Sequence, residues 1–137
     1  MSKLSVAVSL TIAALSITAF AGKREREVKE KDTIPAMRDA ETKWKASCGC
    51  PLTIDLNDSL ESIDELRNAR SMARDVGEHV EKYCSDAASK KALCQMKTMT
   101  LTKGKPVSFT FKDGHGVLTA DGQTWAGFDQ MTKVLDK

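Results

Sequence analysis

The chain has 137 residues, and its 21 lysines and arginines nearly balance its 19 aspartates and glutamates. This balance excludes the strongly basic surface that nucleic-acid-binding proteins need, and it also argues against electrostatic capture by anionic lipid. The length is sufficient for one domain with one hydrophobic core.

Residues 1–21 have the features of a secretory signal peptide. Lys3 supplies the positive start, residues 4–20 carry no charge, and residues 19–21 (Ala-Phe-Ala) place small side chains where a signal peptidase reads. We expect cleavage before Gly22, with retention as a membrane anchor as the alternative, because two basic residues follow the site. Cleavage leaves a net charge of +1 (20 minus 19). The sequence therefore predicts an exported protein, periplasmic or extracellular, without further membrane contact.

Four cysteines follow the leader, at Cys48, Cys50, Cys84 and Cys94. An even number of cysteines behind a signal peptide is typical of a disulfide framework in an oxidising compartment. A bridge between Cys48 and Cys50 would close a very small ring, so we expect each of them to pair with Cys84 or Cys94. Which of the two pairings forms stays open.

The first half of the chain predicts a helix, a strand and a longer helix. Residues 22–32 are almost all charged and indicate a solvated linker or a frayed helical lead-in. Helical spacing of apolar residues follows, with Thr33 as a candidate N-cap and Gly49 as the stop. Residues 51–56 alternate like a half-buried strand, and residues 62–83 have apolar positions three and four apart.

The second half predicts a short helix up to Cys94, three strands and a closing helix. Apolar residues alternate from Met96 to Thr102, from Val107 to Lys112 and near His115 to Ala120, and the dipeptide between the last two strands, Asp-Gly, is typical of a tight hairpin. A short amphipathic helix follows from Phe128 to Leu135. The predicted fold class is α+β: residues 33–137 form a single domain, a small antiparallel sheet of three to four strands with helices packed on one face, stapled by disulfides.

Two thiols separated by one glycine raise a second possibility, a strained disulfide between Cys48 and Cys50 that exchanges with other proteins. However, these residues follow a predicted helix C-terminus, where the helix dipole disfavours a thiolate. A zinc site built from the four cysteines is less favoured still, because the spacing lacks paired two-residue gaps. We therefore predict structural bridges and no metal.

Two further residues are candidates for function. His115 lies at a predicted hairpin tip, where an imidazole could act as a general base, although no partner nucleophile is recognisable. Trp125 stands in polar company before the last helix, where it either anchors that helix or contacts a partner. The other tryptophan, Trp44, falls on the apolar stripe of the first helix and is predicted to lie in the core.

The sequence contains no nucleophile elbow, phosphate loop or dinucleotide fingerprint, so it predicts no cofactor and gives no positive sign of an enzyme. We expect a small exported module that binds a protein or envelope partner. The alternatives are a thiol–disulfide protein that uses Cys48 and Cys50, or a small secreted hydrolase that uses His115. The oligomeric state stays open.

Overall fold

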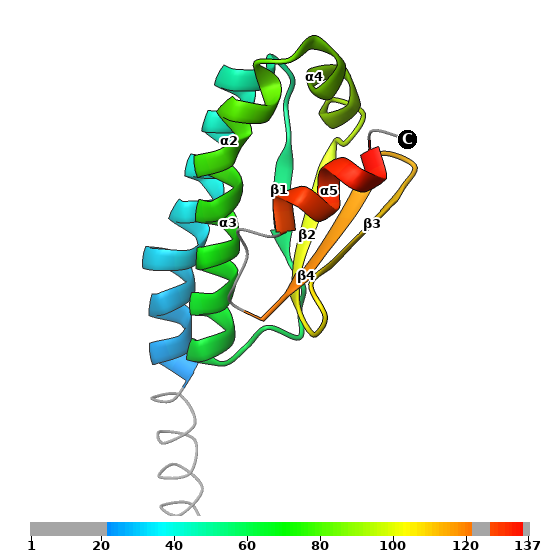
Figure 1. Ribbon diagram of the computed structural model, residues 1–137. Helices are drawn as coiled ribbons and strands as arrows, with labels where there is room; N and C mark the ends of the chain where they lie inside the picture. The colour runs from blue at the N-terminus through cyan, green and yellow to red at the C-terminus, as the bar shows by residue number, and fades with distance from the viewer. Residues whose placement is uncertain (1–21, 122–126, 136–137) are drawn as a thin grey trace, which may run out of the picture.

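The computed structural model describes residues 22–121 and 127–135, in which a pair of long helices packs against a four-stranded sheet (Figure 1). The predicted leader and Trp125 lie outside these residues. The predicted element order is confirmed: α2 (Ile34–Cys48), β1 (Thr53–Leu56), α3 (Ile63–Cys84), α4 (Ala87–Leu93), β2 (Thr98–Lys103), β3 (Ser108–Lys112), β4 (His115–Ala120) and α5 (Gly127–Leu135).

The sheet has the strand order β1-β2-β4-β3 and is mixed. The antiparallel arrangement predicted from the sequence is correct for β3 and β4 but wrong for β1–β2 and β2–β4, which are parallel. The physical reason for the first of these is the connection, because the α3–α4 segment carries the chain back across the sheet and lets β2 run in the direction of β1. β4 then inserts between β2 and its hairpin partner β3.

The helices pack on the apolar face of the sheet, as predicted. α2 and α3 lie side by side, and α5 crosses the same face near β3 and β4 (Figure 1). The centre of this layer is fully buried and includes Trp44, as expected, together with Ile54 and Met99. Other large side chains that are fully buried are Met37, Leu66, Met72, Leu93, Met96, Leu101, Leu118 and Met131.

Residues 22–33, the charged segment, are helical and run directly into α2. Thr33 does not cap a helix start: its backbone is helical, and its buried hydroxyl donates to the Leu66 carbonyl at 2.9 Å. The helix widens to a π-turn over Lys29–Thr33, where the Ile34 N–H bonds to the Lys29 carbonyl. Pro35 explains the widening, because it lacks an N–H and its ring conflicts with the carbonyl four residues earlier.

α3 is an unbroken helix that begins at a complete capping box. The Ser62 hydroxyl accepts the Glu65 N–H at 3.2 Å, and the Glu65 carboxylate accepts the Ser62 N–H at 3.4 Å. Gly77, within α3, permits close packing of two helices. A Cβ at Gly77 would stand only 3.3 Å from the Ala40 Cα of α2.

Two disulfides join the elements at one end of the molecule. Cys48, at the end of α2, pairs with Cys84 at the end of α3, and Cys50 pairs with Cys94, which follows α4. The predicted long-range bridges are therefore confirmed, and the connectivity is resolved. Loops of 36 and 44 residues are closed, worth about 4 kcal/mol each in the chain-entropy account.

Candidate functional site

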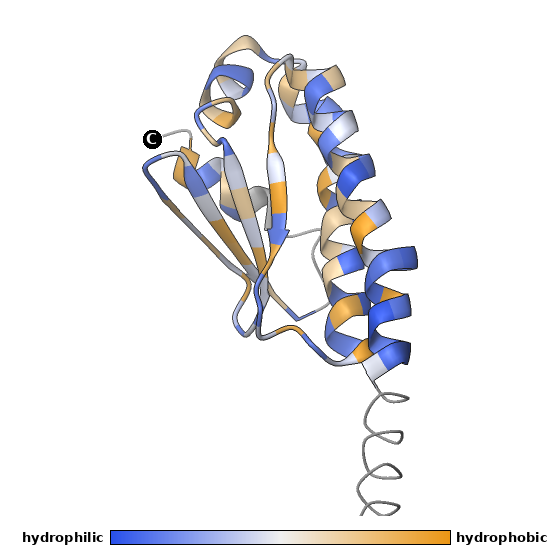
Figure 2. Ribbon diagram, turned by 180° about the vertical axis from the view of Figure 1, so that it is seen from behind, coloured by the Kyte–Doolittle hydropathy of each residue, from blue (hydrophilic) through white to orange (hydrophobic). Residues whose placement is uncertain are grey.

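The face of the sheet opposite the helices is open. Strand alternation places on it a set of mostly hydroxyl-bearing side chains, all exposed or half-buried: Thr53, Asp55, Thr98, Thr100, Thr102, Ser108, Thr110, Lys112, His115, Val117 and Thr119. Figure 2 views the molecule from this side, and no helix of the described residues crosses in front of the sheet. We call this set the open face.

The strand register orders the open face into rows. One row runs from Thr53 through Thr98 and His115 to Lys112. Side chains in a row are about 4.8 Å apart, and successive rows are about 6.7 Å apart along a strand. Because most of these side chains are short and β-branched, their hydroxyls are held near the backbone with few accessible rotamers.

His115 is fixed in this array by two hydroxyls from the neighbouring strand. Its Nδ1 lies 2.5 Å from the Thr98 Oγ1, and its Nε2 lies 3.2 Å from the Thr100 Oγ1. The predicted hairpin places it there: Asp113 (φ 53°) and Gly114 (φ 79°) form the two-residue turn that directly precedes His115. A neutral imidazole donates from one nitrogen and accepts at the other, and a hydroxyl can serve either role.

The Thr98 hydroxyl beside the His115 imidazole also resembles the nucleophile–base pair of a hydrolase. Here the second ring nitrogen contacts a hydroxyl, whereas a catalytic base is usually oriented by a carboxylate. The nearby amides of Lys97 and Thr98 both donate to the Gly114 carbonyl, at 2.7 and 3.2 Å, and cannot stabilise an oxyanion. The described geometry of His115 therefore contains neither the orienting carboxylate nor, at Lys97 and Thr98, the free amides that such a pair uses.

The cysteines do not form the arrangement that the redox alternative needs. Cys48 and Cys50 are bonded to different partners, and the described chain has no free cysteine. Nor do the described residues contain a cluster of three or more potential metal ligands. Each disulfide therefore joins distant segments of the chain, and Cys48 and Cys50 are not joined to each other.

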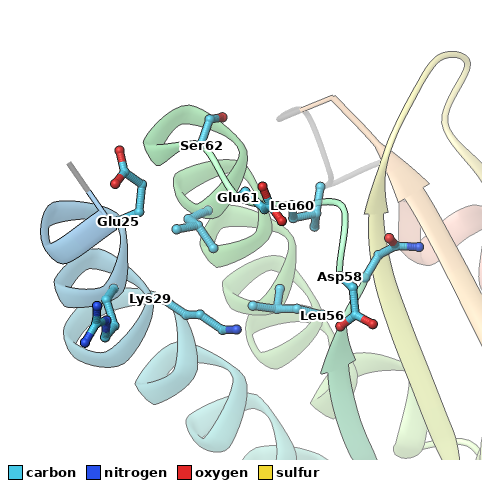
Figure 3. A pocket seen from close by; sticks show the side chains of 11 residues that line it. Glu25, Lys29, Leu56, Asp58, Leu60, Glu61 and Ser62 are labelled. Carbon is cyan, nitrogen blue, oxygen red and sulfur yellow. The ribbon is translucent and has the colours of Figure 1, made fainter. Parts of the chain in front are cut away.

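A cleft of about 550 Å³ lies between residues 22–29, the end of β1 and the loop before α3 (Figure 3). Three leucines, Leu56, Leu60 and Leu66, are among the residues that line it. Arg26 and Lys29 line it from the helix, whereas Asp58 and Glu61 line it from the loop. Because cations and carboxylates occur together, this cleft favours no particular charge in a ligand, whereas the open face presents mostly side chains of one chemical class, hydroxyls.

One edge of the sheet is closed by side chains of α2. The Thr53 amide donates to Lys97, directly before β2, and the Asn57 amide donates to Leu101 of β2, so the Ile54 backbone faces outward. Its N–H donates to the Glu41 Oε1 at 2.9 Å, and its carbonyl accepts from Arg38 at 3.5 Å. Arg38 and Glu41 also form an ion pair, so the pair occupies the positions that another strand would take.

Sequence reasoning singled out His115 and the cysteines but missed Thr98, Thr100 and the Arg38–Glu41 pair. The alternation of threonines from Met96 onward was visible, but their position beside His115 depends on a parallel pairing between distant strands. The i,i+3 spacing of Arg38 and Glu41 was also visible, but nothing in the sequence assigned them to β1.

Comparison with known proteins adds no further assignment: no family model matches the chain, and no curated protein or solved structure is significantly similar to it. Within residues 22–121 and 127–135, no helix is both long and apolar enough to cross a membrane. The two disulfides indicate an oxidising environment.

Proposed function

We propose that this chain is an exported, non-enzymatic module of one domain that binds a protein or envelope partner through the open face. The leader, residues 1–21, is removed before Gly22, and the module acts in the periplasm or outside the cell. Oxidised cysteines support this location, since such bridges persist outside the reducing cytosol.

The observation that carries the proposal is that helices cover one face of the sheet and leave the other face exposed. Helices bury most of one face, but the open face presents ordered hydroxyls, one fixed imidazole and few long flexible side chains. Ordering such side chains on binding loses little rotamer entropy, which lowers the free-energy cost of association.

The scaffold supports the same interpretation. The bridges Cys48–Cys84 and Cys50–Cys94 hold the ends of α2, α3 and α4 together, and α3 packs on β2, one of the two central strands of the sheet. A rigid backbone keeps donors and acceptors in fixed positions, as a preorganised recognition surface requires. The thiol–disulfide and hydrolase alternatives have no comparable support in the geometry.

The test is capture of partners from the native envelope with the mature oxidised protein as bait, compared with two variants. Thr100→Arg places a long charged side chain at the centre of the open face. Thr42→Arg makes the same exchange at an exposed threonine of α2 and serves as the control.

We expect one set of partners to be retained by the wild type and by Thr42→Arg, and lost with Thr100→Arg. Circular dichroism and thermal unfolding establish that both variants are folded. Equal retention by all three proteins, or no specific retention by any of them, would contradict the proposal.

A further inference from the structure

The sheet edge formed by β3 differs from the edge formed by β1 in how its outward backbone groups are paired. Lys112 and His115 flank a two-residue turn and therefore form a hydrogen-bonded pair, after which such pairs alternate along the ladder. Ser108, Thr110 and Lys112 thus direct their backbone N–H and C=O groups toward β4. The corresponding groups of Phe109 and Phe111 point away from the sheet.

Within the described residues, no hydrogen bond from another segment reaches the outward backbone groups of Phe109 and Phe111. Val107, directly before the strand, follows the same alternation, so its backbone groups also point away from β4. Val107 and Phe111 are only partly buried, so apolar side chains remain accessible beside unpaired backbone. An unprotected edge of this kind accepts a further strand.

We propose that the occupant is β3 of a second copy of this chain, paired antiparallel about a two-fold axis through Phe109. In this register the outward-facing residues of both copies meet: Phe109 faces Phe109 of the second copy, and Val107 faces Phe111 of the second copy. Within each of these pairs, the two residues direct their backbone N–H and C=O groups at each other, as the hydrogen-bonded pairs of an antiparallel ladder do.

The side chains agree with this register on both faces. On the helix side every cross-strand pair is apolar, and on the open face Ser108 meets Thr110 of the second copy. Lys112 falls opposite Pro106 of the second copy. The register therefore avoids like charges directly opposite each other, which would destabilise the pairing of two strands. The strand is therefore self-complementary, as a two-fold interface requires.

The two-fold axis is perpendicular to the sheet, so the helices of both copies lie on one side and the two open faces join into a single surface of eight strands. α5 packs on β3, and its C-terminal end lies on the β3 side of the sheet (Figures 1 and 2). It carries Val134, a large apolar side chain that is 37% exposed. The contact is small beside the roughly 1,200 Å² that stable complexes bury, so the dimer is weak and depends on concentration.

The experiment combines sedimentation velocity over a concentration series with amide hydrogen exchange of the mature oxidised protein. We expect the mass to rise toward twice the monomer value with concentration. We also expect the Phe109 and Phe111 amides to gain protection, whereas the Thr110 amide, already bonded to β4, does not change.

Two double variants at exposed positions test the register. Ser108→Lys with Thr110→Lys opposes like charges twice across the axis, whereas Ser108→Glu with Thr110→Lys opposes unlike charges twice. We expect the dissociation constant of the dimer to differ at least about tenfold between them, weaker for the first.

A wild-type protein that remains monomeric at every concentration overturns the proposal, as does a dimer whose dissociation constant is the same in both double variants. Protection of Phe109 and Phe111 that appears only when envelope extract is added would assign the edge to a different protein and also overturn it. The dimer stands apart from the proposed function, because Thr100→Arg lies two strands from this edge and leaves dimerisation unchanged even where it abolishes capture.

Discussion

Gly116 is the position in the sheet where one added methyl group has the largest calculable effect. It lies on the apolar side of β4 and is covered by Met96 and by the ring of Phe109. A Cβ at this position would stand 2.5 Å from the Met96 Sδ and 2.6 Å from the Phe109 Cε2. Both distances are well inside van der Waals contact, so Gly116→Ala forces the core to rearrange.

Overpacking of this kind costs about 1–3 kcal/mol. Alanine in place of glycine also reduces the entropy of the unfolded chain and recovers about 0.5–1 kcal/mol. From the middles of these two ranges we therefore expect Gly116→Ala to lower the free energy of unfolding by about 1 kcal/mol, measured by urea denaturation of the oxidised protein with an unchanged m-value.

Two comparisons isolate the cause. Phe109→Leu removes the ring atoms that the new methyl group would meet, so in the double variant the loss should fall short of the sum of the single losses by about 1 kcal/mol. Gly77→Ala places its Cβ at 3.3 Å from Ala40 and gains helix propensity, so its stability should stay within about 1 kcal/mol of the wild type. A Gly116→Ala protein as stable as the wild type, or strictly additive losses, would refute this account of the packing.

Three other predictions follow from single contacts. The Ser89 N–H and hydroxyl lower the pKa of the Asp86 carboxyl from its usual 3.8, so this N-cap should stabilise α4 fully above about pH 4 and lose its effect as pH falls through the lowered pKa; Asp86→Asn should flatten the acid limb of stability measured by circular dichroism. Glu41→Ala leaves the outward Ile54 N–H without its acceptor and should cost about 1–3 kcal/mol in chemical denaturation, whereas Glu41→Gln, which keeps a carbonyl oxygen, should cost less than half of that. Because Cys50 and Cys94 are half-buried and Cys48 and Cys84 are buried, limited reduction followed by thiol alkylation and mass spectrometry should label the first pair before the second; equal labelling would contradict the burial argument.

The sequence predicted the elements well because each one carries its own periodicity. The Asp113–Gly114 turn is a local pattern, and it occurs where it was expected. Strand direction is not local: it depends on how the α3–α4 segment crosses the sheet and on the insertion of β4 between β2 and β3. Alternation along a strand is the same in parallel and antiparallel pairs, so it could not decide between them.

The charged segment 22–32 shows a second limit of composition. Its composition left a solvated linker and a helical lead-in both open, and the structure has the helix, because the segment continues α2 through a π-turn. At its end, the Thr33 hydroxyl bonds to the Leu66 carbonyl of α3, a residue 33 positions away in the sequence. A capping preference read at Thr33 alone could not anticipate that partner.

At the candidate site, the sequence predicted which residues could take part in chemistry, but it did not predict which residues lie next to them. His115 and the four cysteines stood out by residue type, and the long-range pairing of the cysteines followed from ring geometry. The hydroxyl partners of His115 and the closure of the β1 edge by Glu41 required the register and the position of α2. They arise from tertiary structure, which no short segment encodes by itself.

The most direct test of the account is disulfide mapping of the mature protein isolated from its natural compartment, by proteolysis and mass spectrometry without reduction. Export and the cross-linked scaffold predict two linked peptides, one with Cys48 and Cys84 and the other with Cys50 and Cys94, on a chain that begins at Gly22. Free thiols, a peptide in which Cys48 is joined to Cys50, or a chain that still carries its first 21 residues would contradict it.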